Sequence, residues 1–228
     1  MPDGSECRRI PRYPIQLPLL HAPKTGAATW SGAGWTHNLS EGGACVELDR
    51  RLSAPTAVQV RFQTDCGAIE VAAQVVWEVK PSEGGATPAG GGVLHGVAFT
   101  HLAPDQLLAL RDLLLSQRRD RRAGMRLPVD LAVTCQLRGE AGPPLQGRAG
   151  DMSRGGLLLR LSQALPPGTL LEVTLLPPSG RVTVEGEVVW VDPAYRQTFG
   201  EPIRHGLRFT ALGWSTSLSL ALLLAEGQ

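Results

Sequence analysis

The 228-residue sequence predicts a mainly β protein built from two tandem copies of one module. Three observations support this prediction: short landmarks recur at a nearly constant spacing, the segments between them alternate apolar and polar residues, and glycine and proline gather between those segments. About six short strands fit into each copy. Because a sheet that small leaves exposed edges unless it closes, a six-stranded antiparallel β-barrel is the favoured architecture for each copy.

The repeat rests on four landmarks that occur in the same order in both copies. They are an Arg-x-x-x-Arg segment, an Asx-x-Ser-x-x-Gly turn, a Val-Val-Trp strand and a His-Gly-x-x-Phe strand. These begin at Arg8, Asn38, Val75 and His95 in the first copy and at Arg122, Asp151, Val188 and His205 in the second. The offset between matching positions stays between 110 and 114 residues. We therefore expect one domain over residues 1–117 and another over residues 118–228.

Alternating patterns locate strands between these landmarks. Residues 57–62 and 181–190 alternate apolar and polar side chains, which is typical of a strand with one buried face and one wet face. Glycine and proline, 27 and 18 in all, gather in residues 83–92 and 139–147 and predict loops there.

Each copy ends in a predicted helix. Pro104 and Asp105 suit a first helical turn, and leucines at positions 107, 110 and 114 then recur at helical spacing. The second helix is expected over residues 215–226, where leucines cover more than one face. We expect that helix to pack on a barrel, on the other copy or on a partner subunit, so a homodimer through it is one arrangement that the sequence allows.

The overall composition argues against several classes of protein. With 22 Lys and Arg against 21 Asp and Glu, the formal net charge of +1 gives no general reason to expect a nucleic-acid polymer or an anionic membrane as partner. The four cysteines, Cys7, Cys45, Cys66 and Cys135, show neither a Cys-x-x-Cys pair nor zinc-ligand spacing, so we expect reduced thiols and no metal. No apolar stretch approaches the roughly 20 residues of a membrane span, and we expect a cytoplasmic protein.

The duplicated Arg-x-x-x-Arg segment has the chemistry of an anion site. A guanidinium fork stays charged and donates paired hydrogen bonds to phosphate oxygens or to the O6/N7 edge of guanine. In the Asx-x-Ser-x-x-Gly turn, the Asx oxygen accepts hydrogen bonds, and the serine hydroxyl can donate or accept them. The glycine is expected to allow a positive φ and a close approach of the backbone to a ring.

A single arginine pair also fits a solvated basic run beside a helix end. The turn alone is likewise a weak motif. Its recurrence 25 or 26 residues after each arginine segment makes the combination specific and favours a ligand site over the basic run.

Other prominent residues indicate structure more than chemistry. His95 and His205 lack the partners of a metal or catalytic site at suitable spacing, so we expect structural strand histidines. Trp77 and Trp190 are expected in the core or at the rim of the barrels, with ligand stacking as the alternative. Because no nucleophile, general base or phosphate loop accompanies the arginines, an enzyme is not expected.

Taken together, the four landmarks resemble the PilZ domain, and the resemblance covers nearly all of the chain, twice over. It implies a six-stranded β-barrel with a C-terminal helix, and a role as receptor for the bacterial second messenger cyclic di-GMP without any cofactor. In the second domain it assigns Arg122 and Arg126 to the phosphates and guanine faces of the ligand. It assigns Asp151, Ser153 and Gly156 to holding a guanine on the barrel surface.

The resemblance also implies a site in the first domain. Its matching residues are Arg8, Arg12, Asn38, Ser40 and Gly43. Two neighbouring arginines, Arg9 and Arg121, are expected to add contacts. Asn38 lacks the charge with which Asp151 would attract guanine N–H groups, and the first arginine pair lies close to the N-terminus, where ordering costs more. We therefore expect the second site to be the better one.

The resulting hypothesis is a non-catalytic receptor or effector for cyclic di-GMP. Because the second arginine segment joins the first predicted helix to the second domain, ligand capture is expected to change the interdomain geometry or the binding of a protein partner. The expected outputs are motility, biofilm or exopolysaccharide regulation. The alternative is an adaptor with the PilZ fold that binds no nucleotide and acts through protein–protein interaction.

Overall fold

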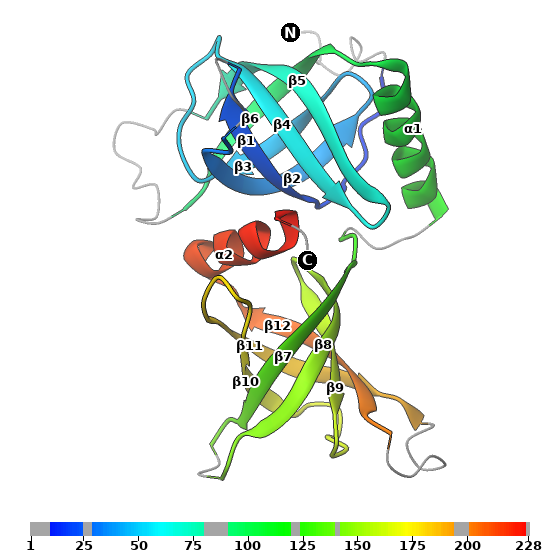
Figure 1. Ribbon diagram of the computed structural model, residues 1–228, viewed down its shortest axis with the longest axis vertical. Helices are drawn as coiled ribbons and strands as arrows, with labels where there is room; N and C mark the ends of the chain where they lie inside the picture. The colour runs from blue at the N-terminus through cyan, green and yellow to red at the C-terminus, as the bar shows by residue number, and fades with distance from the viewer. Residues whose placement is uncertain are drawn as a thin grey trace, which may run out of the picture. The chain divides into compact units, whose positions relative to one another are not determined.

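The computed structural model describes residues 10–24, 29–79, 91–119, 124–139, 142–193 and 201–226. The chain divides into two units, Met1–Met125 and Arg126–Gln228. Each unit is a closed six-stranded antiparallel β-barrel followed by one helix (Figure 1). This architecture confirms the predicted fold class, while the expected domain boundary between residues 117 and 118 stays a prediction.

The strands of the first unit close into a barrel through the pairing of the first and the fourth. They are β1 (Pro18–Pro23), β2 (Gly32–Ser40), β3 (Gly43–Leu48), β4 (Ala57–Thr64), β5 (Gly67–Glu78) and β6 (Val93–His101). Around the barrel their order is β1-β2-β3-β6-β5-β4. In β4 every second residue from Val58 to Thr64 is buried, as its alternating sequence predicts.

The second unit repeats this topology strand for strand. Its strands are β7 (Leu127–Leu137), β8 (Leu145–Ser153), β9 (Gly156–Leu161), β10 (Leu170–Leu175), β11 (Val182–Val191) and β12 (Ile203–Ala211). Around the barrel their order is β10-β11-β12-β9-β8-β7, and β7 closes onto β10. The sequence duplication is therefore also a structural one.

The two barrels fill their interiors with different side chains. In the first, Trp35 and Phe62 are fully buried, and the Phe62 ring meets Phe99 edge-on at a centroid distance of 6.0 Å. The largest fully buried side chains of the second barrel are aliphatic: Met152, Leu157, Leu159, Leu161 and Leu171. The same strand order thus accommodates an aromatic core and a leucine core.

The helix that follows the first barrel is confirmed. This helix, α1 (Pro104–Arg119), packs on β5 and buries Leu110, Leu113 and Leu114. Its opposite face exposes Leu108 and Leu115, which are 60% and 54% accessible to solvent. Since these two leucines lie seven residues apart, they share one outward face of the helix.

The second predicted helix is also present. This helix, α2 (Trp214–Ala225), begins and ends one residue earlier than the leucine pattern predicts, and it packs on β11. Leu220 and Leu224 are buried, and Leu222 remains exposed. Packing on its own barrel, one of the three expected arrangements, is therefore observed, and a homodimer through α2 stays a prediction.

The Val-Val-Trp landmark forms a β-bulge in each barrel. Val76 stands between the paired residues Val75 and Trp77, with no cross-strand partner in the register. Trp77 pairs with Gly96, and a Cβ atom on that glycine would lie 2.0 Å from the indole nitrogen. The same arrangement joins Trp190 to Gly206, at 1.9 Å.

These tryptophans lie on the outer surface of the barrels. Trp77 and Trp190 are 39% and 37% exposed, so of the two expected places, the core or the rim of the barrels, the core is excluded. The bulge adds one residue and turns the tryptophan outward. The indole then covers the backbone of the glycine on the next strand, which explains why the Val-Val-Trp and His-Gly landmarks occur together.

The predicted loop over residues 139–147 is partly wrong. Its last three residues, Leu145–Gly147, belong to β8, where Gly147 pairs with Val133 and with Leu161. A Cβ atom on Gly147 would lie 2.5 Å from the carbonyl oxygen of Arg160. This glycine is present because two strands approach closely, whereas Gly139, with a φ of +86°, does form a turn. In the loop predicted over residues 83–92, positions 83–90 lie outside the described residues, and residues 91 and 92 precede β6 without strand structure.

Candidate functional site

In both barrels the Arg-x-x-x-Arg segment runs antiparallel to the strand that carries the Asx and Ser of the turn motif. This strand is β2 in the first barrel and β8 in the second. In the first barrel, Tyr13 and Leu39 exchange two backbone hydrogen bonds of 2.9 Å. In the second, Leu127 pairs with Met152. One residue further along, this register sets Arg12 beside Ser40 and Arg126 beside Ser153. Pairing of the backbone thus brings together residues that are far apart in the sequence.

An ion pair marks the second site. Arg126 Nη1 donates to Asp151 Oδ1 at 3.1 Å, and the two side chains are 36% and 31% exposed. The structure therefore brings together two residues that the sequence assigns to one ligand. Because both remain open to solvent, the other N–H groups of the guanidinium and the second carboxylate oxygen are available to a ligand.

The motif serines close the turn between two strands. Ser40 Oγ donates to the carbonyl oxygen of Gly43 at 2.9 Å, and Ser153 Oγ donates to that of Gly156 at 3.3 Å. Both serines are buried. Because each hydroxyl already donates its proton within the turn, either serine would accept a hydrogen bond from a ligand and would not donate one.

The motif glycines do not have the backbone conformation that the sequence suggested. Among the residues that the structure describes, positive φ angles occur at Gly67, Gly139, Gly168 and Gly180. A Cβ atom at Gly43 or Gly156 would instead lie 2.2 Å from a carbonyl oxygen of the adjacent strand, that of Val97 or Leu207. The expected positive φ is therefore wrong, and the close approach of two strands is what requires glycine here.

The first site differs from the second in charge and in packing. Asn38 Oδ1 is buried and has no hydrogen-bond partner among the described residues. Asn38 faces Cys45 across the β2–β3 pair. Burial raises the pKa of the Cys45 thiol, and the positive charge of Arg12 partly opposes that rise. Arg12, Asn38 and Cys45 are therefore neighbours in the first barrel. The matching residues of the second barrel are Arg126, Asp151 and Leu158.

Four of the predicted ligand residues lie outside the described part of the chain. They are Arg8, Arg9, Arg121 and Arg122. Their assignment to the two sites stays a prediction.

A cross-strand row, which sequence patterns alone did not identify, connects the motif to the tryptophan. In the first barrel the paired residues are, in order, Asn38, Cys45, Gly96 and Trp77. In the second they are Asp151, Leu158, Gly206 and Trp190. Facing residues of adjacent strands point to the same side of a sheet. The signal was present in the sequence, since three of the four landmarks contribute one residue each to this row.

Comparison with known proteins matches the same two segments. The family model described as "PilZ domain" matches residues 6–116 and again residues 116–216. The chain belongs to the PilZ domain family. No curated protein sequence matches it.

Solved structures of other proteins are also similar to this chain. The PilZ domain of CeSA from a cellulose-synthesizing bacterium is 23% identical, with a TM-score of 0.34, and the match covers 47% of this chain and 97% of that one. YcgR from Escherichia coli, in complex with c-di-GMP, is 13% identical, with a TM-score of 0.38 and coverage of 92% and 84%. The Bacillus subtilis inhibitor of motility, MotI/DgrA, is 11% identical, with a TM-score of 0.37 and coverage of 93% and 95%.

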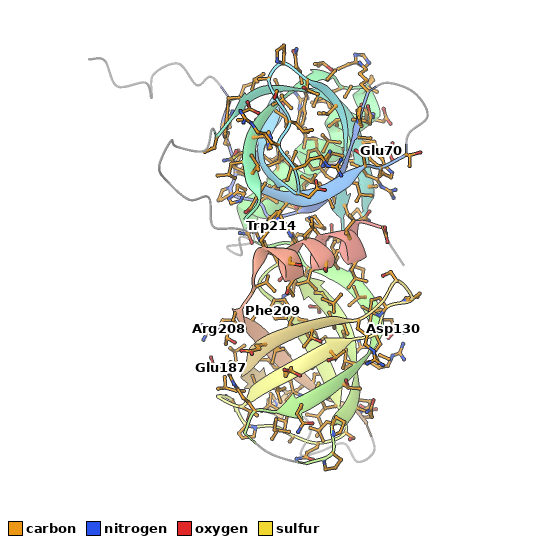
Figure 2. The ribbon with its side chains drawn as sticks, turned by 90° about the vertical axis from the view of Figure 1, so that its left-hand side faces the viewer. Glu70, Asp130, Glu187, Arg208, Phe209 and Trp214 are labelled. Carbon is orange, nitrogen blue, oxygen red and sulfur yellow. The ribbon has the colours of Figure 1, made fainter. Side chains whose placement is uncertain are left out.

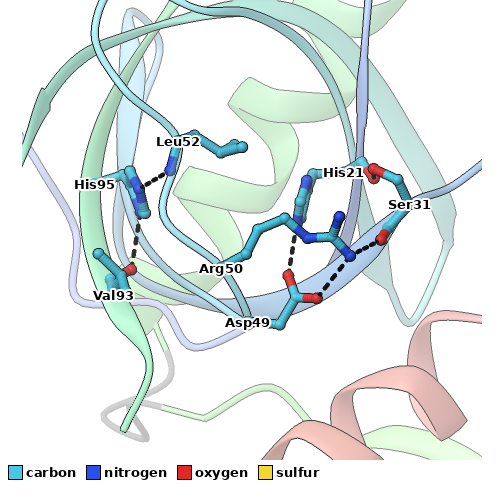
Figure 3. A network of polar contacts seen from close by, with 7 residues as sticks. All are labelled: His21, Ser31, Asp49, Arg50, Leu52, Val93 and His95. Carbon is cyan, nitrogen blue, oxygen red and sulfur yellow. Dashed lines mark hydrogen bonds and ion pairs between the residues drawn. The ribbon is translucent and has the colours of Figure 1, made fainter.

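In both PilZ domains the landmark histidine holds the connection between the third and the fourth strand. The Nε2 atom of His95 accepts a hydrogen bond from the backbone N–H of Leu52 at 3.0 Å, and its Nδ1 atom donates to Val93 O at 2.8 Å (Figure 3). His205 makes the matching bonds to the Leu165 N–H and to Ile203 O, both at 3.0 Å. Both rings are fully buried. The predicted structural role is confirmed.

Acidification is expected to destabilise the second PilZ domain through His205. Burial lowers the pKa of His205 below its ordinary 6.5, so the unfolded chain binds the proton more readily than the folded one. The free energy of unfolding should therefore be constant above about pH 7 and fall as the pH drops through 6.5 towards the lowered value. Thermal unfolding of the full chain between pH 7.5 and 5 measures this slope.

The matched variant is His205→Gln, because the second domain has no other histidine. It should be less stable than wild type at pH 7.5 and should lose most of the pH dependence of the second domain. An unchanged slope in this variant would show that His205 is not the titrating group.

A buried histidine–aspartate pair in the first PilZ domain was not predicted. His21 Nε2 lies 2.7 Å from Asp49 Oδ1, and Arg50 donates to Asp49 Oδ2 at 3.3 Å and to the backbone carbonyl of Ser31 (Figure 3). Burial lowers the pKa of His21, and the hydrogen bond to Asp49 opposes that shift. The Ser31 hydroxyl donates to the His21 backbone carbonyl and not to the imidazole ring, so these residues do not form an activated nucleophile.

Neither a metal cluster nor a membrane span is found in the described residues. No three histidine, cysteine or acidic side chains within these ranges are grouped so that they could hold a metal ion. No helix within the same ranges is long and apolar enough to cross a membrane.

Proposed function

We propose that this PilZ protein is a receptor for cyclic di-GMP. The observation on which this rests is the Arg126–Asp151 pair, at which a guanidinium and a carboxylate of the family motif lie 3.1 Å apart on the outer surface of the second barrel. Ser153 lies beside the arginine, and Trp190 stands at the far end of the same cross-strand row.

The side chains of this site match the chemical groups of a guanine nucleotide. The Arg126 fork can donate to phosphate oxygens or to guanine O6 and N7, and the Asp151 carboxylate can accept from guanine N–H groups. Arg121 and Arg122 would add positive charge for the phosphates. Three or four charge-assisted hydrogen bonds, at roughly 1.5–3 kcal/mol each, would account for much of the ~8 kcal/mol of a micromolar complex.

The first site would bind the same ligand more weakly. Asn38 provides a neutral oxygen where Asp151 provides a charged one. Hydrogen bonds to a charged acceptor are stronger, so guanine N–H groups would bind Asn38 less strongly than Asp151. Arg8, Arg9 and Arg12 would supply its phosphate contacts, with Ser40 and Gly43 forming the turn.

The signal would pass through the connection between the two domains. Residues 120–126 join α1 to β7 and include the second arginine segment. Binding of the nucleotide would order this segment around it, and so would change the interdomain geometry or expose a surface to a protein partner. Motility, biofilm or exopolysaccharide production would be the regulated output.

Titration calorimetry of the full chain with cyclic di-GMP tests this proposal. We expect binding at one strong and one weaker site, and a much weaker response to cyclic di-AMP, which has the same sugar–phosphate ring but lacks the guanine edges. The nucleotide should be recovered unchanged after prolonged incubation, since the protein is proposed to be a receptor and not an enzyme. The absence of binding heat with cyclic di-GMP would contradict the proposal.

An adaptor that binds no nucleotide is the second candidate function. The exposed leucines of α1, Leu108 and Leu115, favour it because an apolar helix face can serve as a docking surface. The same titration distinguishes the two functions, since the adaptor gives no heat with either dinucleotide.

A further inference from the structure

A pocket of about 200 Å³ adjoins the proposed ligand site of the first domain. Its apolar walls are Ile10 and Pro11 from the arginine segment and Leu114 and Leu115 from α1. Its polar wall includes the charged side chains of Glu41, from the motif turn, and Arg111, from α1, and Tyr13 also lines the pocket. Figure 1 shows α1 lying against the first barrel, where the helix can supply that wall.

Strand register connects this pocket to the motif. Tyr13 pairs with Leu39 near the end of β2, and Glu41 and Gly42 form the turn that follows, so Ile10 and Pro11 run towards this turn. A Cβ atom on Gly42 would lie 3.3 Å from Cδ1 of Ile10, which agrees with this placement. The pocket therefore begins one residue beyond Arg12 and Ser40, at the edge of the proposed site.

The polar wall is an exposed ion pair. Arg111 Nη2 donates to Glu41 Oε2 at 3.0 Å, and the two side chains are 50% and 40% exposed. An ion pair this open to solvent contributes little to stability, so a ligand can separate its partners at little cost. Both groups then become available side by side, one as acceptor and one as donor.

Guanine has the complementary edge. Around the rim of the base, the donors N2–H and N1–H and the acceptor O6 follow one another on the Watson–Crick edge, and the acceptor N7 comes next on the Hoogsteen edge. A carboxylate suits the donor half, and an arginine fork suits O6 and N7. The faces of the base are apolar, as are Ile10 and Leu115, which are 46% and 54% exposed and would be covered. Adenine has no N1–H donor and no O6 acceptor, so it fits this wall poorly.

We propose that this pocket is a guanine subsite of the first domain, in which Glu41 accepts from N1–H and N2–H and Arg111 donates to O6 and N7. This inference rests on the proposed function and adds α1 to the binding surface. The second domain lacks the subsite, because Arg154 occupies the position that matches Glu41. The two domains would thus differ in how they select a guanine nucleotide.

The test is a titration of the full chain in which the second site has been disabled by Arg126→Ala and Asp151→Ala. In this background, Glu41→Gln and Arg111→Gln should each weaken cyclic di-GMP binding about tenfold or more, since each removes a charge-assisted hydrogen bond. Glu41→Gln should also reduce the preference for cyclic di-GMP over cyclic di-AMP. A loss of general folding would not change that preference.

Glu70→Gln is the matched control. Glu70 lies 3.8 Å from Arg61 Nε in another ion pair of the same barrel, and the Glu70 side chain is 50% exposed (Figure 2). The Glu70→Gln protein should bind both dinucleotides as its background does, and all variants should keep the same melting temperature.

Three outcomes separate the two proposals. If the background protein binds cyclic di-GMP and both substitutions leave its affinity and selectivity unchanged, the guanine subsite is wrong and the receptor function stands. If the background protein does not bind while wild type does, the first domain has no such subsite. If wild type itself does not bind, the receptor function fails.

Discussion

Replacing Gly156 with alanine is expected to lower the free energy of unfolding of the second barrel by about 3 kcal/mol or more. The added Cβ atom would lie 2.2 Å from the carbonyl oxygen of Leu207, and backbone atoms of a paired strand cannot move aside as a flexible side chain can. At about 4–8 °C per kcal/mol for a domain of this size, the melting temperature of this unit should fall by about 12 °C or more. Differential scanning calorimetry of the full chain measures the change.

The neighbouring glycine provides the control. A Cβ atom on Gly155 would meet nothing within 4 Å, and its φ is not positive. Gly155→Ala should therefore leave the melting temperature within a few degrees of wild type. Equal melting temperatures for Gly155→Ala and Gly156→Ala would contradict the claim that strand approach requires the second glycine. The same pair of substitutions separates folding from binding, because a ligand role alone would not destabilise the free protein.

Replacing Arg126 with alanine is expected to weaken binding of cyclic di-GMP at the second site by about 10- to 150-fold, the loss of one charge-assisted hydrogen-bonded pair. The substitution removes the guanidinium fork and leaves Asp151 without its partner. Arg126→Lys keeps the charge but loses the fork, so its affinity should lie between those of wild type and Arg126→Ala. Titration calorimetry of the three proteins gives this order.

Arg138→Ala serves as the comparison for charge alone. Arg138 forms an exposed ion pair with Glu185 at 3.1 Å in the same barrel and has no place in the proposed site. Its removal changes the net charge by the same amount as Arg126→Ala and should leave the affinity nearly unchanged. A similar weakening by both alanine substitutions would show that Arg126 acts only through the overall charge of the protein.

Local sequence patterns predicted the strands and helices well, because the formation of these elements depends on residues that are close together in the sequence. The alternation in residues 57–62 matches β4, and the leucine spacing after Pro104 matches α1. The internal duplication also required only the order and spacing of landmarks. Arg126 and Asp151 were expected together because both belong to the motif pattern, and the structure joins them in an ion pair.

Features that depend on register were not predictable in the same way. Gly156 was expected to have a positive φ, but its role depends on the approach of β12, about 50 residues away. Trp77 was considered as a core residue because apolar alternation does not reveal a bulge that turns the next side chain outward. The His21–Asp49 pair joins the first strand to the end of the third, which no short pattern connects.

The cross-strand row has a consequence for how the two halves of this protein can diverge. All four residues of a row, from the motif Asx to the tryptophan, come from the same module. Duplication of the module therefore gave each half of the chain a complete row of its own. A substitution in one row then leaves the geometry of the other intact. Asparagine and cysteine in the first domain, against aspartate and leucine in the second, are differences of this kind. Each module can therefore change its own row of residues while the matching row in the other module stays as it was.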